Sequence, residues 1–295
     1  FGKPLNLSSY FKYGQMKNIL LPTDFSENAK NAAAYAVELF KKQECNFYFL
    51  NTYTPAIAHS RFMAETLRGS AVAENESKLS KIGLQKTIDN IRTTTNDPSH
   101  HFETISSFDL LTHKIAETVN SKNIDLIVSG TKGASGYKQV FMGTNTVRMI
   151  KTVDNCPIIT VPEEYSFSVP KHIAFPTDFK HNFSADILDS LLKIVHQFGS
   201  EIHILHINEE EKMDKFQESN RFTLMEYMAP VSHNVHFMPH FSSKSNVISK
   251  FLKELEIDML ALVYNEHGYL NRLMREPIVT NMAYHSKIPL LVLPH

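Results

Sequence analysis

A nine-residue segment of the sequence occurs twice. Residues 17–25 read Lys-Asn-Ile-Leu-Leu-Pro-Thr-Asp-Phe, and residues 171–179 repeat the Lys, Ile, Pro, Thr, Asp and Phe at the same places. Later apolar segments recur in the same order, at 124–127 and 257–260 and again at 156–162 and 288–294. An internal duplication of this length predicts two similar domains. We assign residues 1–15 to an N-terminal extension, 16–163 to the first domain and 170–295 to the second.

Short apolar runs alternate with segments of helical periodicity in the first repeat. The first run stops at Pro22, and Ser26 is the expected N-cap of a helix over 28–40. The other expected elements are strands at 46–53, 101–106, 124–128 and 157–161, one long or two shorter helices within 64–92, and helices at 110–120 and from 144 onward. This alternation predicts a doubly wound α/β fold with a parallel sheet. With strand order 3-2-1-4-5, the loops after the first and fourth strands share one crevice, where such folds bind ligands.

Glycines are concentrated directly after the apolar run at 124–128. The chain has only ten glycines, yet four of them fall between positions 130 and 143: Gly130, Gly133, Gly136 and Gly143. Glycine suits positions where the backbone takes a positive φ or where another group approaches closely. After Gly143 a helix is expected to begin, and the first backbone N–H groups of a helix favour an anion. The segment is therefore either an anion site or an ordinary glycine turn with a capping threonine.

The second repeat lacks this glycine loop. Where the first repeat has Ser-Gly-Thr-Lys-Gly at 129–133, the second has Leu-Val-Tyr-Asn-Glu at 262–266, and Arg275, Glu276 and Pro277 stand near the place of Gly143. Side chains there would block close approach, the carboxylate of Glu276 would repel phosphate, and proline has no N–H to donate. We therefore expect one anion site per chain, in the first repeat.

The spacing Gly130-x2-Gly133-x9-Gly143-Thr144 resembles the ATP-binding signature of the universal stress protein family, G-x2-G-x9-G-[S/T]. Together with the Pro-Thr-Asp-Phe segment, the Cys-Pro-Ile-Ile-Thr-Val-Pro ending of the first repeat and the duplication, it makes residues 16–295 similar to a tandem universal stress protein. The resemblance implies two tandem doubly wound α/β domains, each with a five-stranded parallel sheet of order 3-2-1-4-5 flanked by helices. It also implies dimer-like pairing of the two domains through their last strands.

The same resemblance implies ATP, AMP or ADP as the ligand, with or without Mg²⁺, and a cytoplasmic role in stress regulation. By position, Asp24 would bind the adenosine part and Thr52 would border the adenine, where the family usually has an aliphatic residue. Gly130 and Gly133 would admit ribose and phosphates, and the start of the following helix would cradle the phosphates. The candidate nucleotide-binding residues are Pro22, Thr23, Asp24, Thr52, Gly130, Thr131, Lys132, Gly133, Gly143, Thr144, Asn145 and Thr146.

Several of these residues also have a purely structural interpretation. A carboxylate at a strand end can accept hydrogen bonds from ribose hydroxyls, but Asp24 can equally be a turn residue, and so can Asp178 in the second repeat. Lys132 and Lys138 either assist the phosphates or are solvated loop lysines.

Three functions are compatible with these patterns. The first is a nucleotide-binding regulatory protein, in which ATP in the first domain favours one arrangement of the two domains. The second is a slow ATP hydrolase, and the third an interaction module with a vestigial loop. The sequence has no G-x4-G-K-[S/T] loop, no Gly-x-Ser-x-Gly elbow and no recognisable Cys–His pair, so we assign no catalytic residues and rank an enzyme below a binding protein.

Composition and charge restrict the partners. Lys plus Arg number 30 and Asp plus Glu 31, which gives no basic field for nucleic acid, and no apolar stretch has the length of a membrane helix. The two cysteines, Cys45 and Cys156, favour a reducing cytoplasm. We expect intramolecular domain pairing, with a homodimer as the alternative assembly. Histidines are frequent after residue 170, but His203 and His206 should point to opposite faces of a strand, so no metal site is predicted.

Overall fold

The computed structural model describes residues 16–41, 43–53, 71–95, 97–132, 142–208, 212–239, 244–264 and 287–294. It divides into two compact units, Met16–Phe167 and Ser168–His295. Several sequence predictions fall outside the described residues and stay predictions: those for the segment 1–15, Gly133, Gly136, Lys138, Asn265, Glu266, Arg275, Glu276 and Pro277.

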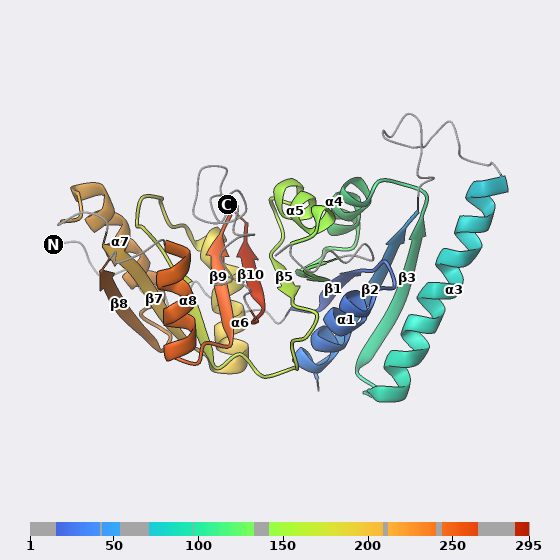
Figure 1. Ribbon diagram of the computed structural model, residues 1–295, viewed down its shortest axis with the longest axis horizontal. Coiled ribbons are helices and arrows are strands. Elements are labelled where there is room, and N and C mark those ends of the chain that lie inside the picture. The colour runs from blue at the N-terminus through green and yellow to red at the C-terminus, as the bar shows by residue number, and fades with distance from the viewer. Residues whose placement is uncertain are drawn as a thin grey trace. The chain divides into compact units, whose positions relative to one another are not determined.

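The first unit is a doubly wound α/β domain (Figure 1). Along the chain its elements are β1 (Asn18–Pro22), α1 (Glu27–Leu39), β2 (Cys45–Thr52), α3 (Ala71–Thr94), β3 (His100–Ser107), α4 (Leu111–Ser121), β4 (Leu126–Gly130), α5 (Thr144–Thr152) and β5 (Ile158–Val161). All its strand pairs are parallel, in the order β3-β2-β1-β4-β5. The predicted fold class and strand order are therefore confirmed for this unit.

The second unit has the same strand order. Its elements are β6 (His172–Pro176), α6 (Ala185–Phe198), β7 (Glu201–Asn208), α7 (Lys215–Met228), β8 (His233–Pro239), α8 (Lys244–Glu254), β9 (Met259–Val263) and β10 (Leu290–Leu293). The strands pair in parallel as β8-β7-β6-β9-β10, which is again 3-2-1-4-5 in chain order. Helix α7 has 14 residues where α3 has 24, so the helix between the second and third strands is shorter than in the first unit.

Helices pack on the strands at the centre of the first sheet. Helix α1 contacts β4 and β5, α3 contacts β2 and β3, and α4 packs against α5. An alanine-rich face makes the close approach of α1 possible, and the side chain of Ser26 caps its first turn as predicted, accepting from the amide of Ala29 at 3.2 Å. Every residue of β5 is buried, whereas in β3, at the edge of the sheet, only the first residue, His100, is buried. Because β1 and β4 are neighbouring parallel strands, their carboxyl ends lie side by side.

Strand β4 begins and ends two residues later than the sequence pattern predicted. Residues 124–128 were expected to form it, but the strand is Leu126–Gly130 and includes the first glycine of the loop. Asp125 precedes the strand, and its carboxylate accepts hydrogen bonds from the amides of Lys17 and Asn18, both at 2.9 Å. Asp258 in the second unit holds the amides of residues 171 and 172 at 2.8 and 2.9 Å. The same contact thus ties the first strand to the fourth in both units.

The turn after the first strand is also built alike in both units. Phe25 has φ 66° and Phe179 has φ 56°, a left-handed conformation that is rare for such a side chain. The amide of each phenylalanine is held by the hydroxyl of the threonine two residues earlier, at 3.0 Å in both cases. This shared geometry explains why Pro-Thr-Asp-Phe recurs in the sequence.

Helix α3 is one continuous helix that passes through Gly83. A Cβ atom on Gly83 would lie 2.5–2.8 Å from ring atoms of Phe25. Helix propensity alone predicts that Gly83→Ala stabilises the protein by about 1 kcal/mol. We expect the opposite sign, a loss of about 1–3 kcal/mol, because the ring of Phe25 occupies that space. Chemical denaturation tests this, with the exposed Asn90→Ala of the same helix as the control; a stabilised Gly83→Ala protein would contradict the contact.

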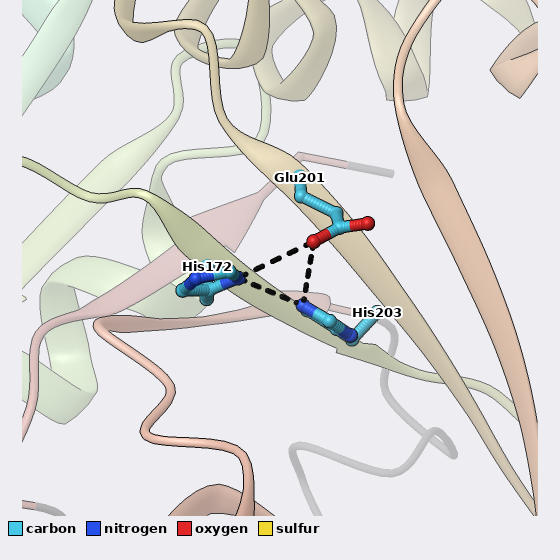
Figure 2. Close-up of side chains that lie close together, drawn as sticks. All are labelled: His172, Glu201 and His203. Atoms are coloured by element: carbon cyan, nitrogen blue, oxygen red, sulfur yellow. Dashed lines mark hydrogen bonds and ion pairs between the residues drawn. The ribbon is translucent and has the colours of Figure 1, made fainter.

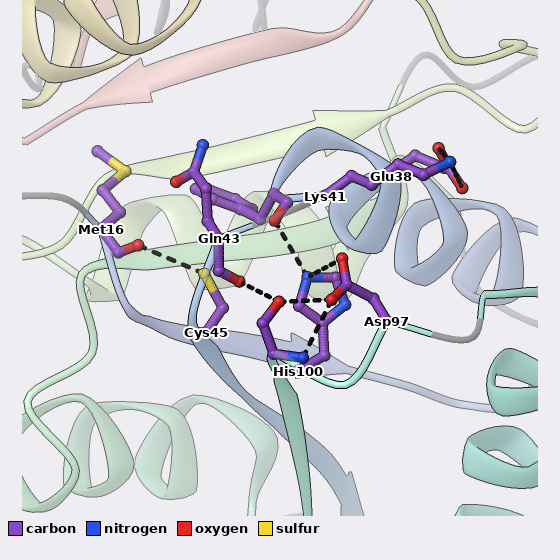
Figure 3. A network of polar contacts seen from close by, with 9 residues as sticks. Met16, Glu38, Lys41, Gln43, Cys45, Asp97 and His100 are labelled. Atoms are coloured by element: carbon purple, nitrogen blue, oxygen red, sulfur yellow. Dashed lines mark hydrogen bonds and ion pairs between the residues drawn. The ribbon is translucent and has the colours of Figure 1, made fainter.

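The amino-terminal ends of β2 and β3 are joined by a polar network (Figure 3). Buried His100 bonds through Nε2 to the carbonyl oxygen of Phe40 at 3.0 Å, and the thiol of Cys45 donates to the carbonyl of Met16 at 3.6 Å. Burial raises the pKa of the Cys45 thiol to about 12, and burial likewise raises the pKa of Cys156 to about 12. Both thiols therefore stay protonated at neutral pH and are unreactive.

Candidate functional site

A pocket of ≈ 110 Å³ opens at the carboxyl ends of β1 and β4. It contains most of the predicted nucleotide-binding residues that the structure describes. Its lining is Pro22, Thr23, Asp24, Ala29, Asn51, Thr52, Leu111, Ser129, Gly130, Lys132, Asn145, Thr146 and Met149. The predicted residues Thr131, Gly143 and Thr144 are outside this lining but adjoin it in the chain.

Asp24 lies at the edge of the pocket with an exposed side chain. Its Oδ1 accepts from the amide of Ser26 at 3.1 Å, and Asp178 holds the amide of Lys180 in the same way at 2.9 Å. Because this bond occurs in both units, it belongs to the turn and needs no ligand. Asp24 is therefore a turn residue, as one of the two interpretations predicted, and its carboxylate also borders the pocket.

The end of β2 forms another wall. Thr52 is half-buried and lines the pocket. Its neighbour Asn51 is buried and donates from Nδ2 to the carbonyl of Thr23 at 2.7 Å. Asn51 therefore fixes the β1–α1 turn against β2. Sequence analysis did not single it out.

Asn28 on α1 holds the first part of the glycine loop. Its side chain is buried; Nδ2 donates to the carbonyl of Val161 at 2.9 Å, and Oδ1 accepts from the amide of Lys132 at 2.7 Å. A Cβ on Gly130 would lie 2.7 Å from both Cγ and Oδ1 of Asn28. The structure thus gives Gly130 a reason that the sequence did not suggest, namely the close packing of α1.

The other side of the loop leads into α5. Gly143 is the N-cap of this helix, its amide donates to the carbonyl of Thr131 at 2.7 Å, and no side chain caps the first turn. Thr146 is buried and its hydroxyl donates to the carbonyls of Gly130 and Thr131 at 3.1 and 3.3 Å. The hydroxyl of Thr146 therefore holds the start of α5 against the end of β4 and is not available to an anion. The backbone N–H groups of Thr144, Asn145 and Thr146 have no partner within the helix and can bind an anion.

The corresponding edge of the second unit is more filled. The hollow at the ends of β6 and β9 measures ≈ 30 Å³ and is lined by Phe175, Pro176, Thr177, Asp178, His181, Asn182, Phe183, Leu262 and Val263. Strand β9 ends in Val263 where β4 ends in Gly130. A separate hollow of ≈ 310 Å³ lies beside β7 and α7, with Lys180, His206 and Lys212 in its lining.

Comparison with known proteins identifies the first unit. Residues 16–162 match the model of the universal stress protein family. The first half of this chain is a universal stress protein domain. Universal stress protein MJ0531 of Methanocaldococcus jannaschii is 27% identical over 157 residues, which are 52% of this chain and 88% of that protein. Universal stress protein YxiE of Bacillus subtilis is 24% identical over 145 residues, 48% of this chain and 97% of that protein.

A solved structure extends the similarity of fold beyond the universal stress protein domain. The crystal structure of a universal stress protein from Archaeoglobus fulgidus covers 95% of this chain and 98% of its own, with a TM-score of 0.61 and 17% identity. A fold similar to that of nearly the whole chain thus occurs in a solved protein structure. Within the described ranges, no helix combines the length and apolar character needed to cross a membrane.

Proposed function

We propose that this protein binds an adenine nucleotide in its universal stress protein domain and acts as a regulatory protein rather than an enzyme. The observation that carries the proposal is the meeting of Asp24, Lys132 and the start of α5 at one pocket. A carboxylate can accept from the ribose hydroxyls of a nucleotide, and backbone amides at a helix start can bind its phosphates. The pocket also lies at the sheet edge where doubly wound folds bind ligands.

Each part of the pocket has a defined task in this proposal. The phosphates would lie at the amides of residues 144–146, where the helix dipole favours negative charge, with the ammonium of Lys132 beside them. Asp24 would accept from the ribose hydroxyls while keeping its bond to Ser26. Thr52 would border the base. ATP, ADP and AMP all carry these groups, and a Mg²⁺ ion would enter with the phosphates of the nucleotide.

The pocket offers little for hydrolysis. Among the described residues that line it, Asp24 is the only carboxylate, and that group already accepts a bond within its own turn. A general base must lie within hydrogen-bond reach of the attacking water. We therefore expect ATP turnover well below the ~10 s⁻¹ median of enzymes. Product formation should be followed with and without Mg²⁺, and metal-dependent turnover at ordinary enzymatic rates would refute the binding-protein proposal.

We further propose that the second unit is a degenerate universal stress protein domain that serves as a built-in partner. Each unit taken by itself has unpaired edge strands, which tend to associate. The apolar strands β5 and β10 are the last of their units, and their pairing would make a homodimer unnecessary. We expect the fragment 16–163 to dimerise or aggregate where the intact chain does not. Sedimentation analysis tests this, and a fully soluble monomeric fragment would weaken the partner role.

A further inference from the structure

Two histidines and a glutamate of the second unit meet on one face of its sheet (Figure 2). His172 begins β6, while Glu201 and His203 are the first and third residues of β7. Nδ1 of His172 lies 3.0 Å from Nε2 of His203, and Oε2 of Glu201 lies 3.5 Å from the first nitrogen and 3.6 Å from the second. We propose that His172, Glu201 and His203 bind a divalent transition-metal ion such as Zn²⁺.

The separations fit such an ion. With bonds of about 2.0–2.1 Å to nitrogen and about 2.0–2.2 Å to oxygen, the ligand atoms of a tetrahedral zinc ion lie about 3.3–3.5 Å apart. The three donor atoms therefore form one face of a tetrahedron of nearly the right size. His172 is 43% exposed and Glu201 31%, so the fourth position is open to solvent or to a further ligand. Imidazole and carboxylate are ordinary zinc ligands, whereas Mg²⁺ prefers oxygen alone.

Neighbouring side chains orient the donors. Asn234 on β8 donates from Nδ2 to Oε1 of Glu201 at 2.7 Å, which turns Oε2 toward the two imidazoles. The other ring nitrogen of His203 lies 3.2 Å from Nε2 of His236, whose ring packs edge-on against Phe251 of α8. Such secondary contacts hold a ligand in the orientation that a metal requires.

The universal stress protein domain shows that the sheet does not need this cluster. His172 of β6 lies opposite Glu201 of β7. The equivalent pair in the first unit is Asn18 of β1 and Asn46 of β2, and the residue equivalent to His203 is Tyr48. In the first unit, Nδ2 of Asn46 donates to Oδ1 of Asn18 at 2.8 Å. The same backbone therefore accepts asparagines at these places, and the histidines and glutamate are an addition peculiar to the second unit.

The sequence spacing concealed this group because its members come from two strands. His203 was compared with His206, which lies on the opposite face of β7, with its ring stacked on Phe179 at 4.9 Å. His172 lies 31 positions before its partner His203. Only the parallel pairing of β6 with β7 brings the donors together.

Zinc binding by the intact chain, freed of metal and of nucleotide, tests the proposal independently of the nucleotide site. We expect calorimetry to find one Zn²⁺ per chain, Co²⁺ to give the visible absorption of a four-coordinate ion, and Mg²⁺ not to compete. The variants His172→Asn and Glu201→Asn copy the first unit and should each weaken Zn²⁺ binding at least about tenfold. His101→Asn, on exposed β3, is the matched control and should leave the affinity unchanged.

Thermal unfolding without metal should show that these variants keep the fold, since asparagines occupy the matching positions of the first unit. Zn²⁺ should raise the unfolding temperature of the parent and of His101→Asn equally, and that of the two site variants by less. Two results would overturn the site: a parent that binds Zn²⁺ no more tightly than His172→Asn, or an equal loss in His101→Asn. If Glu201→Asn fails to fold, the His172→Asn variant, at a half-exposed position, still decides the outcome.

Discussion

Replacing Gly143 by valine is expected to abolish ATP binding while the protein stays folded. Gly143 has φ −66° and ψ 156°, which any residue can adopt, so the substitution adds no backbone strain. The hydrogen bond from the backbone N–H of Gly143 to the carbonyl of Thr131 does not involve the side chain and would remain. The branched side chain would, however, stand at the start of α5, where we propose that the phosphates bind. Calorimetric titration with ATP should therefore show binding below detection.

The control for this variant lies at the other end of the same helix. Thr152 is exposed, and Thr152→Val introduces the same side chain away from the loop. We expect it to bind ATP as the parent does, with an unfolding temperature close to that of the Gly143 variant. If Gly143→Val binds ATP as tightly as the parent, the phosphates do not lie at the start of α5.

Removing the side chain of Asn28 should strongly destabilise the universal stress protein domain. Asn28→Ala takes the acceptor away from the amide of Lys132 and removes one of the two hydrogen bonds to the carbonyl of Val161, which keeps the bond from the amide of Thr131 at 3.2 Å. An unsatisfied buried group costs about 1–3 kcal/mol and the lost second hydrogen bond about 1 kcal/mol, so we expect the free energy of unfolding to fall by about 2–4 kcal/mol in total. Nucleotide binding should weaken as well, because Lys132 loses its anchor.

Asn31 on the same helix supplies the matched control. Its Nδ2 donates to the carbonyls of Pro162 and Tyr165 at 3.0 and 3.1 Å, but the side chain is only half-buried. Water can replace part of these bonds, so Asn31→Ala should cost about 1 kcal/mol. Urea denaturation measures both variants. Equal losses for the two would contradict the role assigned to Asn28.

Much of the fold follows from local features of the sequence. The elements could be located to within a few residues from Pro22, the Ser26 cap and the spacing of the apolar residues. The right-handedness of strand–helix–strand connections then restricted the topology of the sheet. The shift of β4 could not be anticipated, because it depends on the carboxylate of Asp125 reaching back to Lys17, 108 positions away. Local patterns carry no information about such a bond.

The candidate site was predictable in position but not in detail. Glycines and hydroxyl residues marked the loop, whereas its support by Asn28 involves contacts across 133 and 104 positions. The packing reason for Gly130 arises from the same contact. The histidine and glutamate cluster was missed for a similar reason, since strand pairing rather than spacing assembles it.

The binding stoichiometry of ATP on the intact chain tests the central claim most directly. Titration calorimetry on protein stripped of nucleotide should give one ATP per chain, because the start of α5 lies in the universal stress protein domain and β9 of the second unit ends in Val263 instead of glycine. The Gly143→Val protein should then bind none. Two ATP molecules per chain, or one that remains bound in the Gly143→Val protein, would contradict the account.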